Sequence, residues 1–286
     1  MKNHARTREI QTAFVLGKSA TVIKYIFLFF WAICTVFPFL WVVNNALRDN
    51  SQILGRPFSP PSPLIIENFI TVLRASRIPL NFFNSFIYST SATLVTLFIS
   101  CMAAYSIIRI LKSNFLFIYF IAGFMIPVHS VIIPMFISMR MLGLLNTRLA
   151  MILIYIAGNI AFSIFVLSGF IKTIPLALEE AAIIDGASKT SIFFRIILPL
   201  CKPGLATVGT FVFLGCWNDF LIALLFASRP NLATMNLAVF SFRGLSHVDY
   251  GPMYACIVLL IIPVVIIYML FQEQVIRGLS AGALKG

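Results

Sequence analysis

The chain has 286 residues, of which 60% are hydrophobic and only 10% are charged. Soluble globular domains carry about 25% charged residues, so this composition excludes a soluble domain and indicates an integral membrane protein. We attribute the formal net charge of +12 to membrane topology and attraction to anionic lipid, and expect no nucleic-acid partner. The five cysteines form no Cys-x-x-Cys pair, which indicates packing residues and no disulfide framework or metal site.

Six apolar stretches are long enough to cross a hydrocarbon core of roughly 30 Å, which takes about 20 residues of helix. They predict an all-α, polytopic fold with six transmembrane helices over residues 22–43, 84–108, 115–137, 150–170, 205–227 and 254–271. We divide the chain into an N-terminal arm (1–21), a six-span domain (22–272) that contains a polar segment (171–204), and a C-terminal tail (273–286).

The N-terminus also fits the beginning of a secretory signal peptide, because five basic residues precede an apolar run. That run, from Ile26 to Val43, is longer than a usual signal core, and no small-x-small cleavage site follows it. We therefore interpret it as a retained first span.

The distribution of basic residues predicts the orientation of the spans. With the N-terminus inside, the inner segments hold 13 of the 21 Lys and Arg residues. Basic residues resist translocation, so this bias predicts that both termini and the segment 171–204 lie in the cytoplasm.

Prolines mark two further features of the spans and their loops. The outer loop 44–83 contains Pro57, Pro60, Pro61 and Pro63 and, from Glu67 to Leu73, a sequence that could begin a short surface helix. Inside the predicted spans, prolines remove a backbone hydrogen bond and favour kinked helices. They stand at Pro38, Pro127, Pro134 and Pro263. His129, between two of them, has two open interpretations, a residue that lines a path and a hydrogen-bonded packing residue.

The polar segment 171–204 predicts two short helices joined by a turn. Pro175 to Ala182 forms the first, Asp185-Gly186 the turn, and Ala187 to Ile197 the second, with an apolar stripe at helical spacing. We considered two interpretations of the segment. In the first, it docks another protein, and the apolar stripe supplies the contact surface that the partner buries. In the second, it lies as an amphipathic loop on the lipid surface.

The fifth predicted span contains Trp217, Asn218 and Asp219. A carboxylate within a span is costly unless it faces water, a partner or the bundle interior. Two interpretations remain open for Asp219, backbone hydrogen bonding at a helix irregularity with Asn218 and direct contact with a substrate. Trp217 is similarly open between aromatic packing and stacking on a ring of a ligand.

No catalytic constellation is found in the sequence. The stretch Gly186-Ala187-Ser188-Lys189-Thr190 lacks the spacing of a phosphate-binding loop, so we expect no ATP hydrolysis by this chain and no bound cofactor. The three histidines, His4, His129 and His247, are too far apart in sequence to suggest a metal site.

The spacing within the polar segment is specific when it is taken as a whole. Glu180-Ala181-Ala182, three residues, Gly186, nine residues, Ile196, one residue and Leu198-Pro199 resemble the E-A-A loop of ABC-importer permease subunits. Asp185-Gly186-Ala187, Trp217-Asn218-Asp219 and the ending Gly278 to Gly286 resemble the carbohydrate-uptake branch, in particular its smaller, maltose-type permease subunit. Leu284 stands where that subunit would have Val, a conservative difference.

The resemblance implies a multi-pass protein of a prokaryotic cell membrane that forms half of a translocation pathway with a second, homologous permease. Two partner ATPase subunits would use ATP and Mg²⁺, and an extracytoplasmic sugar-binding protein would deliver the sugar. The residues that would dock the ATPase as a cytoplasmic coupling helix and its surroundings are Glu180, Ala181, Ala182, Asp185, Gly186, Ile196, Leu198 and Pro199. The C-terminal tail would also reach toward the ATPase dimer.

Two other classes of function were weighed against this one. An ion-gradient-driven secondary carrier for a small solute usually shows internal repeats and several intramembrane ionisable residues, whereas Asp219 is nearly alone here. A membrane-embedded enzyme would need a constellation of catalytic residues that is missing.

Overall fold

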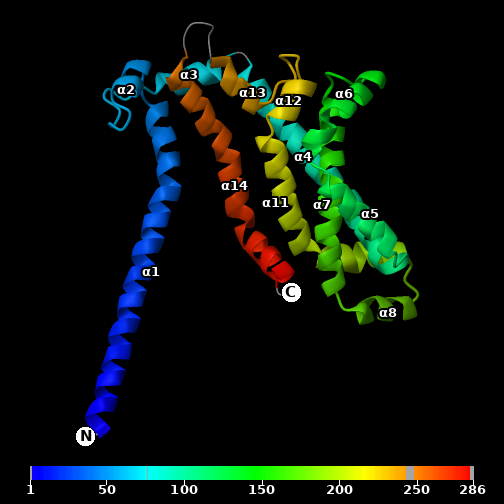
Figure 1. Ribbon diagram of the computed structural model, residues 1–286. Helices are drawn as coiled ribbons and strands as arrows, with labels where there is room; N and C mark the ends of the chain where they lie inside the picture. Colours follow the sequence, from blue (N-terminus) through cyan, green and yellow to red (C-terminus); the bar gives the residue numbers. More distant parts are fainter. Residues whose placement is uncertain (1, 76, 243–247, 284–286) are drawn as a thin grey trace. The chain divides into compact units, whose positions relative to one another are not determined.

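The computed structural model describes residues 2–75, 77–242 and 248–283, and side chains from residue 21 to residue 276 outside those gaps. All regular elements of this described part are helices, which confirms the all-α part of the predicted fold class (Figure 1). Four helical stretches are long and apolar enough to cross a membrane, and the number rises to six if each of two sharply bent helix pairs is one span.

The four unbroken candidate spans belong to the longest helices. Residues Thr21–Ala46 lie in α1 (Lys2–Ala46), and Ile78–Ile110 combine α4 (Ile78–Tyr105) with a π-helical turn, η1 (Ser106–Ile110). The third span is α7 (Arg148–Thr173), and the fourth, Tyr250–Ile276, belongs to α14 (Tyr250–Ala283). Both α1 and α14 continue through their internal prolines, Pro38 and Pro263.

The span predicted over residues 115–137 is not a single kinked helix. The segment forms α5 (Asn114–Met125), a 3-10 turn η2 (Val128–Val131) and α6 (Ile132–Met141), and the two arms meet at 83°. Ile126 is extended, with ψ of 116°, because the ring of the following Pro127 disfavours the helical conformation of the preceding residue. The predicted kink is therefore a complete break.

The span predicted over residues 205–227 is also interrupted, since α11 extends only over Lys202–Asn218. Its N-terminal side is joined at 72° to a helical stretch made of α9 (Lys189–Ile192), the π-helical η3 (Phe193–Ile197) and α10 (Leu198–Leu200). Beyond α11, the chain forms α12 (Leu221–Phe226), α13 (Met235–Val239) and η4 (Phe240–Phe242).

The remaining helices are short and lie between the spans. They are α2 (Asn50–Gly55), α3 (Glu67–Arg74) and α8 (Leu176–Ile184). The position of α3 confirms the short helix predicted from Glu67 in the first loop.

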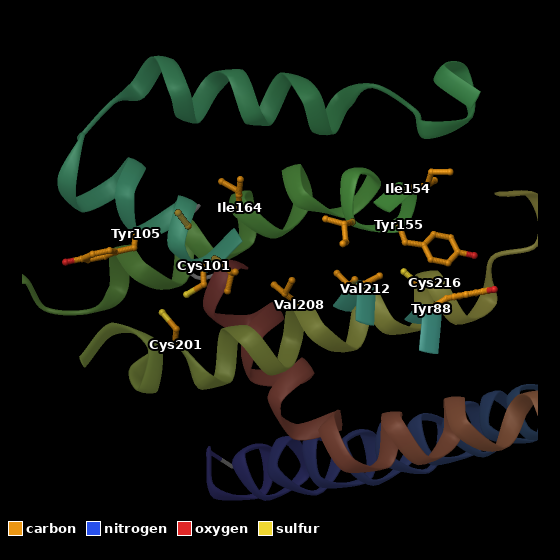
Figure 2. Packing of buried hydrophobic residues seen from close by; sticks show 14 of the residues in the cluster. Tyr88, Cys101, Tyr105, Ile154, Tyr155, Ile164, Cys201, Val208, Val212 and Cys216 are labelled. Carbon is orange, nitrogen blue, oxygen red and sulfur yellow. The ribbon is translucent and has the colours of Figure 1, made fainter. Parts of the chain in front are cut away.

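The chain consists of two compact units, and the larger one comprises residues 71–248 and 259–286. Its core is built where α4 packs against α7 and α11. Figure 2 shows this core, with Tyr105, Cys101 and Cys201 toward one end and Tyr155, Cys216 and Tyr88 toward the other. Small residues of α4 face it and let the helices approach closely, as is typical of membrane bundles. The buried ones are Ser85, Ser89, Ala92, Thr93, Thr96, Ser100 and Ala104.

The smaller unit, residues 1–70 and 249–258, is organised around Arg48. This arginine is completely buried, and its guanidinium donates to the Asn45 side chain, the Pro57 carbonyl and the Ser59 hydroxyl, at 3.0, 3.2 and 2.9 Å. It also donates to the carbonyls of Gln52 and Arg56. One side chain thus satisfies backbone groups throughout the loop that follows α1.

The start of α14 packs tightly within this same unit. A Cβ atom on Gly251 would lie 2.6 Å from the Arg48 carbonyl oxygen and 2.6 Å from the Asn68 amide nitrogen. Asn68 is itself fixed, because its side chain donates to the carbonyls of Ala46 and Arg48, both at 2.9 Å. Only glycine fits at this position without displacement of the backbone.

We therefore predict that Gly251→Ala destabilises the protein by about 1–3 kcal/mol, the usual cost of overpacking. Gly55→Ala is the matched control, because no atom lies within 4 Å of the added methyl group there. Thermal unfolding of the detergent-solubilised protein measures both. Equal melting temperatures for the two variants would contradict the close packing of Gly251.

Candidate functional site

The predicted helix and turn of the polar segment are present at one end of the larger unit. Pro175 precedes α8, and Gly186 follows its C-cap Asp185 with φ of +79°, a left-handed conformation that glycine adopts without penalty. Figure 1 shows α8 at the end of this unit opposite α12 and α13. The second helix begins at Lys189 in α9, and the hydroxyl of its N-cap Ser188 accepts a hydrogen bond from the Ser191 amide at 3.2 Å.

One surface of α8 and the turn after it is exposed, and we call it the α8 surface. It combines a carboxylate, small residues and large apolar side chains, and Ile184 is 86% exposed. Its members are Leu176, Leu178, Glu180, Ala181, Ile183, Ile184, Asp185 and Gly186. Large apolar side chains outside a candidate span are costly to leave in water, so this surface fits contact with another protein or with lipid.

The later part of the motif lies differently from the α8 surface. Ala182, Ile196 and Leu198 are half-buried against the hydrophobic core, and Pro199 is exposed. Most of the predicted docking residues on α8 and its turn are therefore exposed, whereas Ala182 of α8 and Ile196 and Leu198 of the second helix pack against the core.

The apolar stripe of the second helix does not offer anchor area to a partner, contrary to our expectation. Ile192, Phe193 and Ile197 are buried in the chain's own core. The Phe193 ring lies 5.6 Å from the Tyr105 ring of α4, so the stripe attaches the polar segment to the bundle.

Behind the α8 surface lies an ion pair that sequence reasoning missed. Glu179 is 5% exposed, and its Oε1 lies 3.0 Å from Nε of Arg109 in η1. Its other oxygen accepts a hydrogen bond of 3.4 Å from the buried Tyr105 hydroxyl. The available signal was a cation at the end of an apolar run and a second carboxylate beside Glu180, but the sequence does not show that the two meet.

Asp219 lies at a helix end and binds backbone amides, which agrees with the first of its two interpretations, backbone hydrogen bonding at a helix irregularity. It is the extended C-cap of α11, and its carboxylate accepts hydrogen bonds from the amides of Ile222 and Ala223 at 3.3 and 2.9 Å. The Tyr155 hydroxyl of α7 donates to the same carboxylate at 2.9 Å. The side chain thus closes the first turn of α12 and ties it to α7.

The other residues singled out near the helix breaks have distinct surroundings. Trp217 is buried, stacks on Phe213 at 5.8 Å and donates its indole N–H to the Leu260 carbonyl at 3.1 Å. Asn218 ends α11 and is exposed, and His129 is exposed in η2 at the 83° bend. Of the tail motif, Gly278 to Ala283 continue α14, and Leu284 to Gly286 lie outside the described residues.

Residues 96–281 match the family described as "Binding-protein-dependent transport system inner membrane component". The chain belongs to this family. The match contains α8, the Arg109–Glu179 pair and Asp219.

Curated relatives match over nearly the whole chain. The diacetylchitobiose uptake system permease protein NgcG of Streptomyces coelicolor is 33% identical over 92% of this chain and 88% of its own length. The trehalose/maltose transport system permease protein MalG of Thermococcus litoralis is 35% identical over 89% of this chain and 93% of its own.

A solved structure shares the fold. A chain of a bacterial ABC transporter involved in the import of the acidic polysaccharide alginate superposes with a TM-score of 0.75 and 21% identity, over 88% of this chain and 95% of that one. A chain of the MetNI methionine ABC transporter in inward-facing conformations superposes with a TM-score of 0.54 and 18% identity, over 74% of this chain and 98% of that one. At these identities the likeness concerns the fold alone.

The contacts of Asp219 generate a prediction about its contribution to stability. Asp219→Ala removes the acceptor for two backbone amides and should destabilise the protein by about 1–3 kcal/mol, whereas Asp219→Asn, which keeps one carbonyl acceptor, should cost less. Thermal unfolding of the two variants beside Tyr155→Phe measures this. If Asp219→Ala unfolds like the wild type and yet abolishes uptake, the structural interpretation of this carboxylate is wrong.

Proposed function

We propose that this chain is a permease subunit of an ATP-driven, binding-protein-dependent importer of a sugar, and that it forms half of the translocation pathway. Family membership and relatives that are named for sugar uptake support the proposal. The observation that carries it is the exposure of Glu180 and Ala181 on a short helix outside the candidate spans, and of Gly186 in the turn that follows this helix.

The α8 surface has the chemistry of a docking site for an ATPase subunit. Ala181 is small enough to let a partner backbone approach, and Ile183 and Ile184 offer apolar area that a cleft would desolvate. The exposed Glu180 carboxylate can pair with an arginine of the partner. We place this surface in the cytoplasm with both termini, since that orientation follows from the distribution of basic residues.

The remaining parts of the assembly lie on other polypeptides. A second, homologous permease would complete the pathway, two ATPase subunits would bind ATP and Mg²⁺, and an extracytoplasmic binding protein would supply the sugar, all at the plasma membrane of a prokaryote. An ion-gradient-driven carrier is less well supported, because the Asp219 carboxylate is occupied by Tyr155 and two backbone amides. A coupling-ion site needs a carboxylate that is open to the ion.

The proposal predicts that Glu180→Ala weakens the association with the ATPase subunit by about tenfold, the effect of losing a charged contact at the centre of an interface. Membrane insertion should be unaffected, because Glu180 is exposed and has no role in the core. Co-purification of the ATPase with the tagged chain at several salt concentrations measures the association.

Glu67→Ala is the matched control. Glu67 is an exposed carboxylate in the first turn of α3, in the loop that the orientation places on the outer side. Its removal should leave the association unchanged. Equal retention of the ATPase by the wild type and by Glu180→Ala would argue against docking through α8.

A further inference from the structure

The attachment of α8 to its own bundle is unusual in its chemistry. Of the nine residues of α8, all of which are described, only Glu179 is buried, and Ala182 alone is half-buried. The four large apolar residues of the helix, Leu176, Leu178, Ile183 and Ile184, are exposed. The main contact between α8 and the bundle is therefore made by a charged side chain, where an apolar side chain would be expected.

The partner of Glu179 is itself fixed by the end of α7. The Arg109 guanidinium donates through Nη2 to the carbonyl oxygens of Ile171 and Ile174, at 2.8 and 2.5 Å. These carbonyls belong to the last turn and C-cap of α7, where the helix dipole favours a cation. Arg109 thus joins η1 to α7 and at the same time pairs with Glu179.

The contact has a second donor and an apolar enclosure. Tyr105 and Arg109 are four residues apart and both reach the Glu179 carboxylate. Ile171, Ile174 and Phe193 are buried close by, in the same core. Exclusion of water strengthens an ion pair and makes the loss of one partner costly.

Backbone connections alone would leave α8 free to tilt. On one side it is joined to α7 only through Ile174 and Pro175, both extended, and on the other side it ends at the Asp185-Gly186 turn. Arg109 also lies in a π-helical turn, and such turns occur frequently at functional sites.

From this geometry we infer that Arg109 and Glu179 are positioning residues that make α8 move as one body with α4 and α7. The inference rests on the proposed function, in which a partner displaces α8. Force applied to the α8 surface then reaches two spans through the pair, because the links at Pro175 and Gly186 would absorb it if the pair were absent.

The test compares Glu179→Gln with Glu67→Gln, an exposed carboxylate outside the α8 surface, in the assembled transporter in nanodiscs. Nitroxide labels are placed at Ala177→Cys on α8, outside the α8 surface, and at Leu94→Cys on α4, both exposed positions, in a Cys34→Ser background that removes the one exposed cysteine of the described residues. Pulsed electron paramagnetic resonance gives the distance distribution in the nucleotide-free and the ATP–vanadate states. Co-purification of the ATPase and the melting temperature are measured on the same samples.

We expect the parent protein and Glu67→Gln to give one narrow distribution that nucleotide does not change. In Glu179→Gln the distance distribution should broaden. Removing one partner of a buried pair should shift the equilibrium between α8 attached to the bundle and α8 detached from it toward the detached state, by about a hundredfold or more. The ATPase should stay bound to Glu179→Gln, since the α8 surface is intact. An unchanged, narrow distribution in Glu179→Gln overturns the inference, even if its melting temperature falls.

Two further results keep the test decisive. If Glu179→Gln does not insert, the double variant Arg109→Gln/Glu179→Gln removes both charges, and a distribution as narrow as that of the parent protein would contradict the need for an ion pair. If the ATPase fails to bind the parent protein, the proposed function fails. The nucleotide-free distances of the chain then still decide whether the pair holds α8.

Discussion

Ionised side chains that bond to unpaired backbone groups hold together the irregular parts of this protein. In the smaller unit the Arg48 guanidinium donates hydrogen bonds to carbonyl oxygens of the loop after α1. In the larger unit Arg109 binds the carbonyls at the end of α7, and Asp219 binds the amides at the start of α12. A membrane interior supplies no partners for such groups, so helix interruptions persist only where the protein satisfies them itself.

This solution has a consequence for the polar segment. Because a carboxylate attaches α8 to the bundle, its apolar residues are not needed for that attachment and remain exposed. The second helix shows a different division, since Ile192, Phe193 and Ile197 of its apolar stripe are buried in the core. The two parts of the sequence motif therefore have different roles. The part on α8 forms an exposed surface, and the part on the second helix packs against the bundle.

The sequence was sufficient for the helical fold class, the approximate location of the long helices, and the helix and turn around Gly186, because these depend on apolar length and local backbone preferences. It did not reveal that Pro127 and Asp219 mark complete breaks, since hydropathy continues across both. Nor did it separate Glu179 from Glu180, because adjacent helical residues point in different directions and only the bundle decides which one is enclosed. The interpretation of Ile192 and Phe193 failed for the same reason.

Photo-cross-linking from Ile184 tests the central claim most directly. This residue is 86% exposed on the α8 surface, and Leu54, 65% exposed on α2, is its counterpart in a loop assigned to the outer side. A photoreactive amino acid at residue 184 should capture the ATPase subunit in native membranes, and one at residue 54 should not. Capture from residue 54, or none from residue 184 in an intact complex, would contradict the account.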